Sequence, residues 1–213
     1  MIVGKADKAD KCIALTFDDG PDSTTGKLLA ILRELQVCAT FFLCGERIRV
    51  FPNEAKAIAD AGHEIGNHSY DHVYMNELEE EAIYRNFKQA EGAIVEVAGK
   101  KPPFIRVPYV SYSESVFKAA MNMNMPVVGC DVIGHDWEEA VDEANIVENV
   151  LSSAKDGGVI LLHEPYEKTR AALPVIVNAL RLRGYAIMSV GELAKQRHMT
   201  LQAGVCYNAL QEM

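Results

Sequence analysis

The chain has 213 residues, a length that fits one domain, or at most two small ones, and that can bury a core without disulfides. Hydrophobic residues make up 49% and charged residues 24%, which excludes disordered, collagen-like and disulfide-scaffold proteins. Lys and Arg total 21 against 30 Asp and Glu. The resulting net charge of −9 argues against a nucleic-acid partner and permits a neutral polymer or a small molecule.

No apolar run approaches the roughly 18 residues of a transmembrane helix, so we expect no membrane span. The N-terminal segment lacks the apolar core of a signal peptide, so the protein is either cytoplasmic or made with a leader that this sequence lacks. The five cysteines form no C-x-x-C pair and are predicted to be buried free thiols. The location and the oligomeric state stay open.

Short apolar runs alternate with amphipathic patterns along the chain. In the first half of the chain they predict a strand at 12–17, a helix around 28–35, a strand at 39–43, and helices around 55–61 and 83–97. The second half is predicted to have strands at 104–107, 126–130, 159–162 and 185–190, each followed by a helix, at 113–123, around 147–154, around 173–180 and at 191–196 respectively. About seven strand–helix alternations predict an α/β fold with a parallel sheet covered by helices, either a barrel or a doubly wound sheet. No linker divides the chain, so we expect a single domain over 1–213.

Two adjacent carboxylates, Asp18 and Asp19, follow the first predicted strand. The carboxyl ends of the strands form the active face of a parallel barrel. There, one carboxylate can bind a metal while the other acts as a base. An Asp-Gly pair is also common in plain surface turns, so the pair alone leaves both interpretations open.

His68 and His72 are four residues apart, a spacing that would place both on one side of a helical turn, within reach of one metal. Six histidines in the chain make a chance pair plausible, but Gly66 and Asn67 before them are typical of a strand that ends in a loop. Together with Asp19, the pair would give a site of two histidines and one carboxylate with open positions. Such a site activates water.

Other polar side chains follow later predicted strands. His163 ends a very apolar strand, Asp136 and Trp137 follow a strand region, and Arg106 and Tyr109 follow the strand after a proline pair. Taken singly, these residues also fit a core histidine, a packed tryptophan and a surface arginine. Together they fall at strand ends that a barrel would bring to one face.

These motifs resemble those of the polysaccharide deacetylase family, carbohydrate esterase family 4, over about 12–207. Thr-Phe-Asp-Asp-Gly-Pro at 16–21 and His-Ser-Tyr-Asp-His at 68–72 match its first two motifs. Three further segments resemble the family's third, fourth and fifth motifs. They are Arg-Val-Pro-Tyr at 106–109, Asp-Trp at 136–137 and Leu-Leu-His at 161–163. The resemblance implies a distorted (β/α) barrel, similar to a TIM barrel, and one divalent metal ion, with zinc as the default and cobalt, nickel or iron also possible.

The resemblance also implies roles for individual residues. Asp19, His68 and His72 would bind the metal. Asp18 would be the general base, and His163 would be the general acid that protonates the leaving group.

Five further residues would support these groups. Asp136 would pair with the acid and set its protonation, and Arg106 would hold the base in place. The backbone N–H of Tyr109 would stabilise the oxyanion, while Trp137 and Leu161 would line the pocket for the acetyl methyl group.

Two departures from the family pattern bear on the substrate rather than on the chemistry. The third motif often ends in Tyr-Gly, but Val110 follows the tyrosine here, so we expect a differently shaped loop. An aspartate often precedes Asp136 by three residues, but that position holds Ile133, with Asp131 nearby.

The sequence therefore predicts a metal-dependent hydrolase that removes acetyl groups from an acetylated carbohydrate. N-deacetylation of N-acetylglucosamine units in peptidoglycan or chitin-like oligomers is favoured. O-deacetylation of xylan would use the same residues and stays open. The retained metal and catalytic residues argue against a non-catalytic carbohydrate-binding domain and against a metal-free amidohydrolase.

Overall fold

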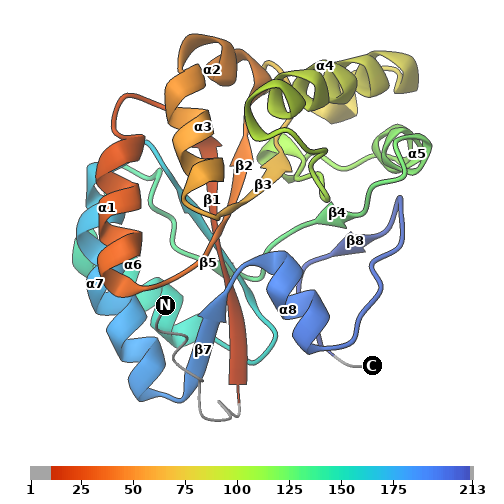
Figure 1. Ribbon diagram of the computed structural model, residues 1–213. Coiled ribbons are helices and arrows are strands. Elements are labelled where there is room, and N and C mark those ends of the chain that lie inside the picture. The colour runs from red at the N-terminus through yellow and green to blue at the C-terminus, as the bar shows by residue number, and fades with distance from the viewer. Residues whose placement is uncertain (1–10, 212–213) are drawn as a thin grey trace.

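A long buried strand, β1 (Lys11–Gly20), lies at the centre of a parallel sheet in the computed structural model, which describes residues 11–211 (Figure 1). β2 (Thr40–Leu43) pairs with the carboxyl half of β1, and β7 (Tyr185–Met188) pairs with its amino half. β6 (Val159–His163) pairs with β1 in a register that sets Asp18 opposite His163. The register thus brings two predicted site residues side by side.

The sheet continues on both sides of these strands. Its order is β3-β2-β1-β6-β5, with β3 at Glu64–Asn67 and β5 at Val132–Ile133. Single parallel bridges join β3 to Ile105 and Ile105 to β4 (Val127–Val128), which pairs with β8 (Cys206–Tyr207). No ladder joins β4 to β5 within residues 11–211. The sheet therefore curves into the distorted barrel that the sequence predicts.

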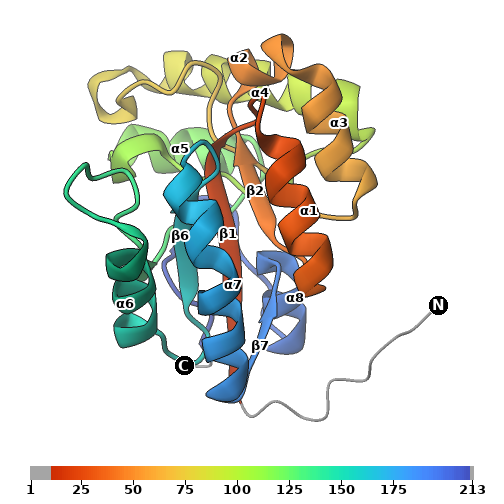
Figure 2. The same cartoon turned by 90° about the vertical axis from the view of Figure 1, so that its left-hand side faces the viewer.

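Helices cover the sheet from outside. They are α1 (Thr25–Leu35), α2 (Gly45–Val50), α3 (Pro52–Asp60), α4 (Glu80–Ala98), α5 (Glu114–Asn122), α6 (Glu143–Ser153), α7 (Glu167–Leu182) and α8 (Val190–Gln196), with short 3₁₀ turns at Met75–Glu77 and Pro108–Val110. Figures 1 and 2 show α1, α6 and α7 packed side by side along one flank of β1 and β6. Capping boxes begin α6 and α8, because Asp142 and Ser189 each accept the N–H three residues on.

The largest core cluster lies between this flank of the sheet and its helices. Phe17 of β1 and Phe41 of β2 are fully buried, with ring centroids 5.2 Å apart. Leu162 of β6 and Ile176 of α7 are buried in the same cluster. Each fully buried side chain of this size contributes about 1.5–3 kcal/mol. This core makes the strands a rigid support for the residues at their carboxyl ends.

The structure corrects several details of the predicted elements. The strand predicted at 104–107 is reduced to the single bridged residue Ile105, and the one at 126–130 to two residues, because the chain leaves the ladder at Gly129. The thiol of Cys38 is exposed rather than buried, and two other cysteines are only partly buried. Within residues 11–211, no helix is long and apolar enough to cross a membrane.

Candidate active site

A pocket of about 610 Å³ opens at the carboxyl ends of the strands. Nine of the ten predicted site residues line it, namely Asp18, Asp19, His68, His72, Arg106, Tyr109, Trp137, Leu161 and His163. The tenth, Asp136, is fully buried and contacts His163. Residues from across the sequence thus meet at one place.

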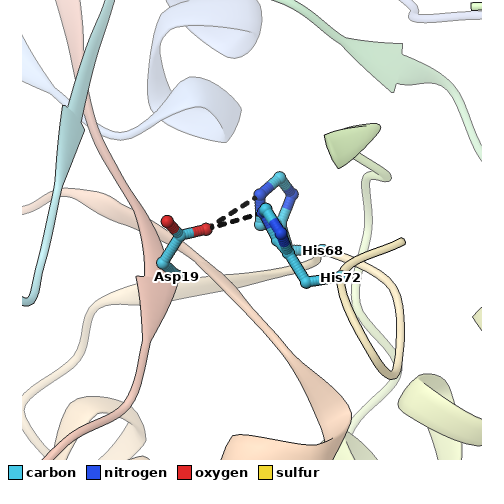
Figure 3. Close-up of side chains that lie close together, drawn as sticks. All are labelled: Asp19, His68 and His72. Atoms are coloured by element: carbon cyan, nitrogen blue, oxygen red, sulfur yellow. Dashed lines mark ion pairs between the residues drawn. The ribbon is translucent and has the colours of Figure 1, made fainter. Parts of the chain in front are cut away.

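Three of the side chains form a tight cluster (Figure 3). Asp19 Oδ1 lies 2.9 Å from His72 Nε2 and 3.3 Å from His68 Nε2. One donor atom from each residue lies within 4.8 Å of the others. His68 Nδ1 is 2.9 Å from the carbonyl oxygen of Arg106. This oxygen accepts a hydrogen bond from Nδ1–H, so the free lone pair is on Nε2, where it can bind a metal.

The loop after β3 brings the two histidines together, and the prediction of a helical turn is wrong. Ser69 and His72 both adopt left-handed backbone conformations, with φ of 70° and 56°. Asn67 Oδ1 accepts the N–H of Ser69 at 2.9 Å, and Ser69 Oγ accepts the N–H of His72 at 3.0 Å. These local hydrogen bonds hold a turn in which both imidazoles point toward Asp19 (Figure 3).

This cluster fits a divalent metal ion. Asp19 Oδ1 is buried and receives no well-directed hydrogen bond from residues 11–211. Burial raises the pKa of the Asp19 carboxyl, but His68 and His72 outweigh burial and hold the pKa well below its ordinary value. Two imidazole nitrogens and one carboxylate oxygen form a donor set that zinc and related transition ions accept. A cation would satisfy the orphaned oxygen.

A second carboxylate lies beside the cluster. Asp18 is buried, and its Oδ1 accepts a hydrogen bond of 2.8 Å from Nη1 of the buried Arg106. Its Oδ2 is 3.7 Å from His68 Nε2. Nη2 of Arg106 donates to the carbonyl of Gly129 at 2.8 Å, which fixes the guanidinium. Asp18 is therefore oriented toward the metal cluster by a buried ion pair.

The partly buried His163 of β6 pairs with the fully buried Asp136 of the segment after β5. His163 Nδ1 is 2.7 Å from Asp136 Oδ1, and the backbone N–H of His163 donates to Asp136 Oδ2 at 2.7 Å. Burial favours the neutral imidazole, but the hydrogen bond and charge of Asp136, with the charges of Asp18 and Asp19, raise the pKa of His163. Because Nδ1 is taken, Nε2 is the nitrogen that remains for a ligand.

The other three predicted residues shape the pocket. No acceptor within residues 11–211 takes the backbone N–H of Tyr109. The Trp137 ring meets the His163 ring edge-on at 5.1 Å, and Leu161 lies two residues before His163 on the same face of β6. Val110, which follows Tyr109, has a φ of 54°, in the left-handed region that favours glycine.

Sequence reasoning missed other residues that contact this site. The buried Thr169 of α7 donates to Asp136 Oδ2 at 2.5 Å, and Thr16 of β1 accepts from Arg106 at 2.6 Å. Tyr74 lines the pocket beside Tyr109. Neither a lone threonine in a helix or strand nor a lone tyrosine after a motif carries a signal of its own.

The fold and the site together have the features of the class of metal-dependent hydrolases. A site of two histidines and one carboxylate leaves positions open for water and substrate, and a second carboxylate lies next to it. The buried histidine–carboxylate pair adds a proton donor.

Comparison with known proteins gives the family. The family model for polysaccharide deacetylases matches residues 5–128, and the chain belongs to this family, carbohydrate esterase family 4. It is 34% identical to a peptidoglycan-N-acetylglucosamine deacetylase of Bacillus cereus over 89% of this chain and 91% of that protein. It is 36% identical to a bifunctional xylanase/deacetylase of Pseudobutyrivibrio xylanivorans over 88% of this chain and 31% of that protein.

A solved structure supports the same assignment. The family 4 acetyl xylan esterase of Clostridium thermocellum, in complex with a cobalt ion, superposes with a TM-score of 0.88 and 30% identity, covering 95% of this chain and all of that one. The fold is therefore the distorted (β/α)₇ barrel of this family, and the doubly wound alternative is excluded. The chain spans only 31% to 42% of the length of several curated relatives.

Proposed function

We propose that this chain is a metal-dependent deacetylase that removes the N-acetyl group from N-acetylglucosamine units of peptidoglycan or chitin-like oligomers. The observation that carries the proposal is that three groups converge at one pocket. They are a set of three metal-binding side chains that leaves open positions, the buried carboxylate of Asp18 held by Arg106, and the pair of His163 with the buried Asp136. Each group has a separate task in amide hydrolysis.

Asp19, His68 and His72 would hold one divalent ion, with zinc as the default and cobalt, nickel or iron as alternatives. A cobalt ion is present in the related acetyl xylan esterase, which supports a metal at this place. The ion supplies Lewis acidity, which polarises the acetyl carbonyl and makes water a better nucleophile at neutral pH.

The carboxylate of Asp18 would take a proton from the attacking water, whose oxygen bonds to the carbonyl carbon. The guanidinium of Arg106, hydrogen-bonded to Asp18 at 2.8 Å, would hold this carboxylate in place beside the attacking water. The backbone N–H of Tyr109 would donate to the carbonyl oxygen as it gains negative charge. Its freedom from any acceptor within residues 11–211 supports this role.

His163 would then give its Nε2 proton to the nitrogen of the breaking C–N bond, so that the sugar amine and acetate leave. Asp136 stabilises the imidazolium before this transfer. Trp137 and Leu161 would surround the acetyl methyl group. The buried acid pair favours an amide substrate, because an amine must be protonated to leave, while a sugar alkoxide needs that help less.

The lining of the pocket also favours an uncharged sugar unit. Arg106 is the only lysine or arginine that lines it within residues 11–211, and this side chain is buried and fully engaged with the protein. Apart from the proposed metal ion and His163, which would serve the reacting acetyl group, no free cation lines this pocket within residues 11–211 to bind a substrate carboxylate. Such a polymer substrate would place the working enzyme at the cell envelope or outside the cell.

O-deacetylation of xylan is the second candidate. The similarity to an acetyl xylan esterase over 95% of this chain and to a bifunctional xylanase/deacetylase favours it. In both reactions the same residues would attack an acetyl carbonyl.

The experiment that tests the proposal measures acetate released from N-acetylglucosamine oligomers and from acetylated xylan by the zinc-loaded protein. We expect a higher kcat/KM on the N-acetylglucosamine oligomers. A preference for acetylated xylan would favour the second candidate, and no acetate from either substrate would contradict both.

A further inference from the structure

A run of aromatic rings extends from His72, one of the three metal-binding side chains, to the rim of the pocket. The Tyr109 ring meets the His72 ring edge-on at 4.6 Å and stacks on the Tyr74 ring at 4.1 Å, with 15° between the planes. Tyr74 is 51% exposed and Tyr109 is 54% exposed, and both line the pocket. Two stacked rings that stay this exposed on a pocket wall present an apolar surface that residues 11–211 do not cover.

Val110 continues this surface under backbone strain. Its φ of 54° is unfavourable for a β-branched residue, since the Cβ substituents crowd the adjoining peptide groups. Its side chain also lines the pocket and is 55% exposed, so core packing does not account for the valine. Strained backbone that persists at a binding site is typical of a position where function requires the side chain.

We propose that Tyr74, Tyr109 and Val110, called here the aromatic wall, bind the sugar ring next to the unit that loses its acetyl group. The inference rests on the proposed function and deepens it, because it makes the enzyme prefer oligomers over single sugars. Pyranose rings present flat C–H faces that pack on aromatic rings, and no residue of the wall is charged at neutral pH.

The position of the wall supports this occupant. His72 follows β3 and His163 ends β6, strands that lie on opposite sides of β1. Trp137, beside His163, therefore flanks the pocket from the side of the acid, and the wall flanks it from the side of the metal cluster. From His72 the rings run outward to Tyr74, so the wall starts next to the reacting group and reaches beyond it.

Trp137 allows the proposal to be tested by binding, without turnover. It is the only tryptophan of the chain, it lines the pocket, and it is 41% exposed, so its fluorescence reports an occupied pocket. The dissociation constants of N-acetylglucosamine and of its β-linked tetramer are measured on zinc-loaded protein that carries Asp18→Asn to suppress turnover. The same background then receives Val110→Gly or Tyr74→Ala.

Val110→Gly removes little buried surface, because Val110 is 55% exposed, and it relieves the backbone strain, so the melting temperature should stay the same or rise. We expect tetramer binding to weaken by roughly tenfold in each variant, and monomer binding to change by less than about twofold. Val205→Gly is the matched control, because Val205 is partly exposed and lies outside the pocket, and it should leave both constants unchanged.

Equal changes in the dissociation constants of monomer and tetramer, or no change in either, would overturn the proposal that the aromatic wall binds a neighbouring sugar ring. Tetramer-selective weakening in a protein that releases no acetate from any acetylated sugar would support the wall and contradict the proposed function. The two proposals therefore fail separately.

Discussion

Arg106 shows how one buried side chain organises the site. Its guanidinium donates to Asp18, to the Thr16 hydroxyl and to the carbonyls of Val128 and Gly129. A buried charge is stable only when it is paired and hydrogen-bonded, and here every partner comes from β1, from β4 or from the residue that follows β4. The same contacts that satisfy the arginine fix the orientation of the proposed base.

The two adjacent aspartates should respond differently to substitution. Asp18→Asn keeps all three metal-binding side chains, so the metal should be retained, while kcat falls about 10²–10⁴-fold for loss of a general base. Asp19→Asn replaces the anionic metal-binding carboxylate with a neutral amide, a much weaker ligand, and should release the metal. Metal stoichiometry and kcat of both variants test this, and the opposite pattern would exchange the two assignments.

Asp136 should control the alkaline limb of the rate profile. Burial opposes protonation of His163, and Asp136 is the main group that raises the pKa of this histidine in return. As the proposed acid, His163 would work only below its pKa, so Asp136→Asn should move the alkaline limb of kcat/KM to lower pH. The decrease of kcat/KM at alkaline pH should be larger on N-acetyl than on O-acetyl substrates.

The matched control is the exposed pair of His135 and Glu138, 2.9 Å apart, beside the pocket. Glu138→Gln breaks a histidine–carboxylate pair of similar geometry and should leave the limb in place. If Asp136→Asn also leaves it in place, Asp136 does not tune the proposed acid.

At the scale of elements, the junction of β6 with α7 supports the end of β1. His163 lines the pocket, and the next residue, Glu164, is fully buried toward α1, where it accepts a hydrogen bond from the Thr25 hydroxyl. The N–H of Glu164 donates to the carbonyl of Asp18 at 3.0 Å, and a Cβ at Gly20 would overlap its carboxylate. Glu164 therefore fills the space that glycine leaves at the carboxyl end of β1, next to Asp18 and Asp19.

This glutamate should make the stability of the protein depend on pH. Burial raises the pKa of Glu164 to about 7 from an ordinary 4.5. Between these values the unfolded chain has released the proton and the folded chain keeps it, so stability falls as the pH rises. By linkage, the loss reaches about 3 kcal/mol at most above pH 7.

Glu164→Gln removes this titration, so the free energy of unfolding should fall less between pH 5 and pH 8 than in the wild type. Urea unfolding at the two pH values measures the difference. Glu139→Gln, at an exposed carboxylate, should behave as the wild type does. Equal pH dependence in Glu164→Gln and the wild type would show that Glu164 does not titrate in this range.

At the scale of the whole molecule, the strands buried on both faces were predictable. β1, β2 and β6 are almost entirely buried and contain continuous apolar runs, which parallel strands covered by helices require. β5 and β8 have two residues each, and α2 has six, so none is long enough to show a period. The sheet order was not predictable, because it depends on contacts between distant segments.

The site was predictable wherever its residues fall in a motif at a strand end. The pairs of Asp136 with His163 and of Arg106 with Asp18 were predictable, because both members lie in motifs. Partners outside the motifs were not predictable, because side-chain contacts join distant positions. Thr169, for example, is 33 residues from Asp136 in the sequence. The loop of His68 and His72 escaped prediction because its hydrogen bonds depend on Asn67 and Ser69, whose side chains also fit an ordinary turn.

The central claim is that a metal held by Asp19, His68 and His72 makes this barrel a deacetylase. Its most direct test is acetate release from the N-acetylglucosamine tetramer before chelation, after chelation, and after one equivalent of zinc or cobalt is restored. The account predicts that activity disappears with the metal and returns with it, and that His72→Ala cannot be restored in this way. Full acetate release by metal-free protein would contradict it.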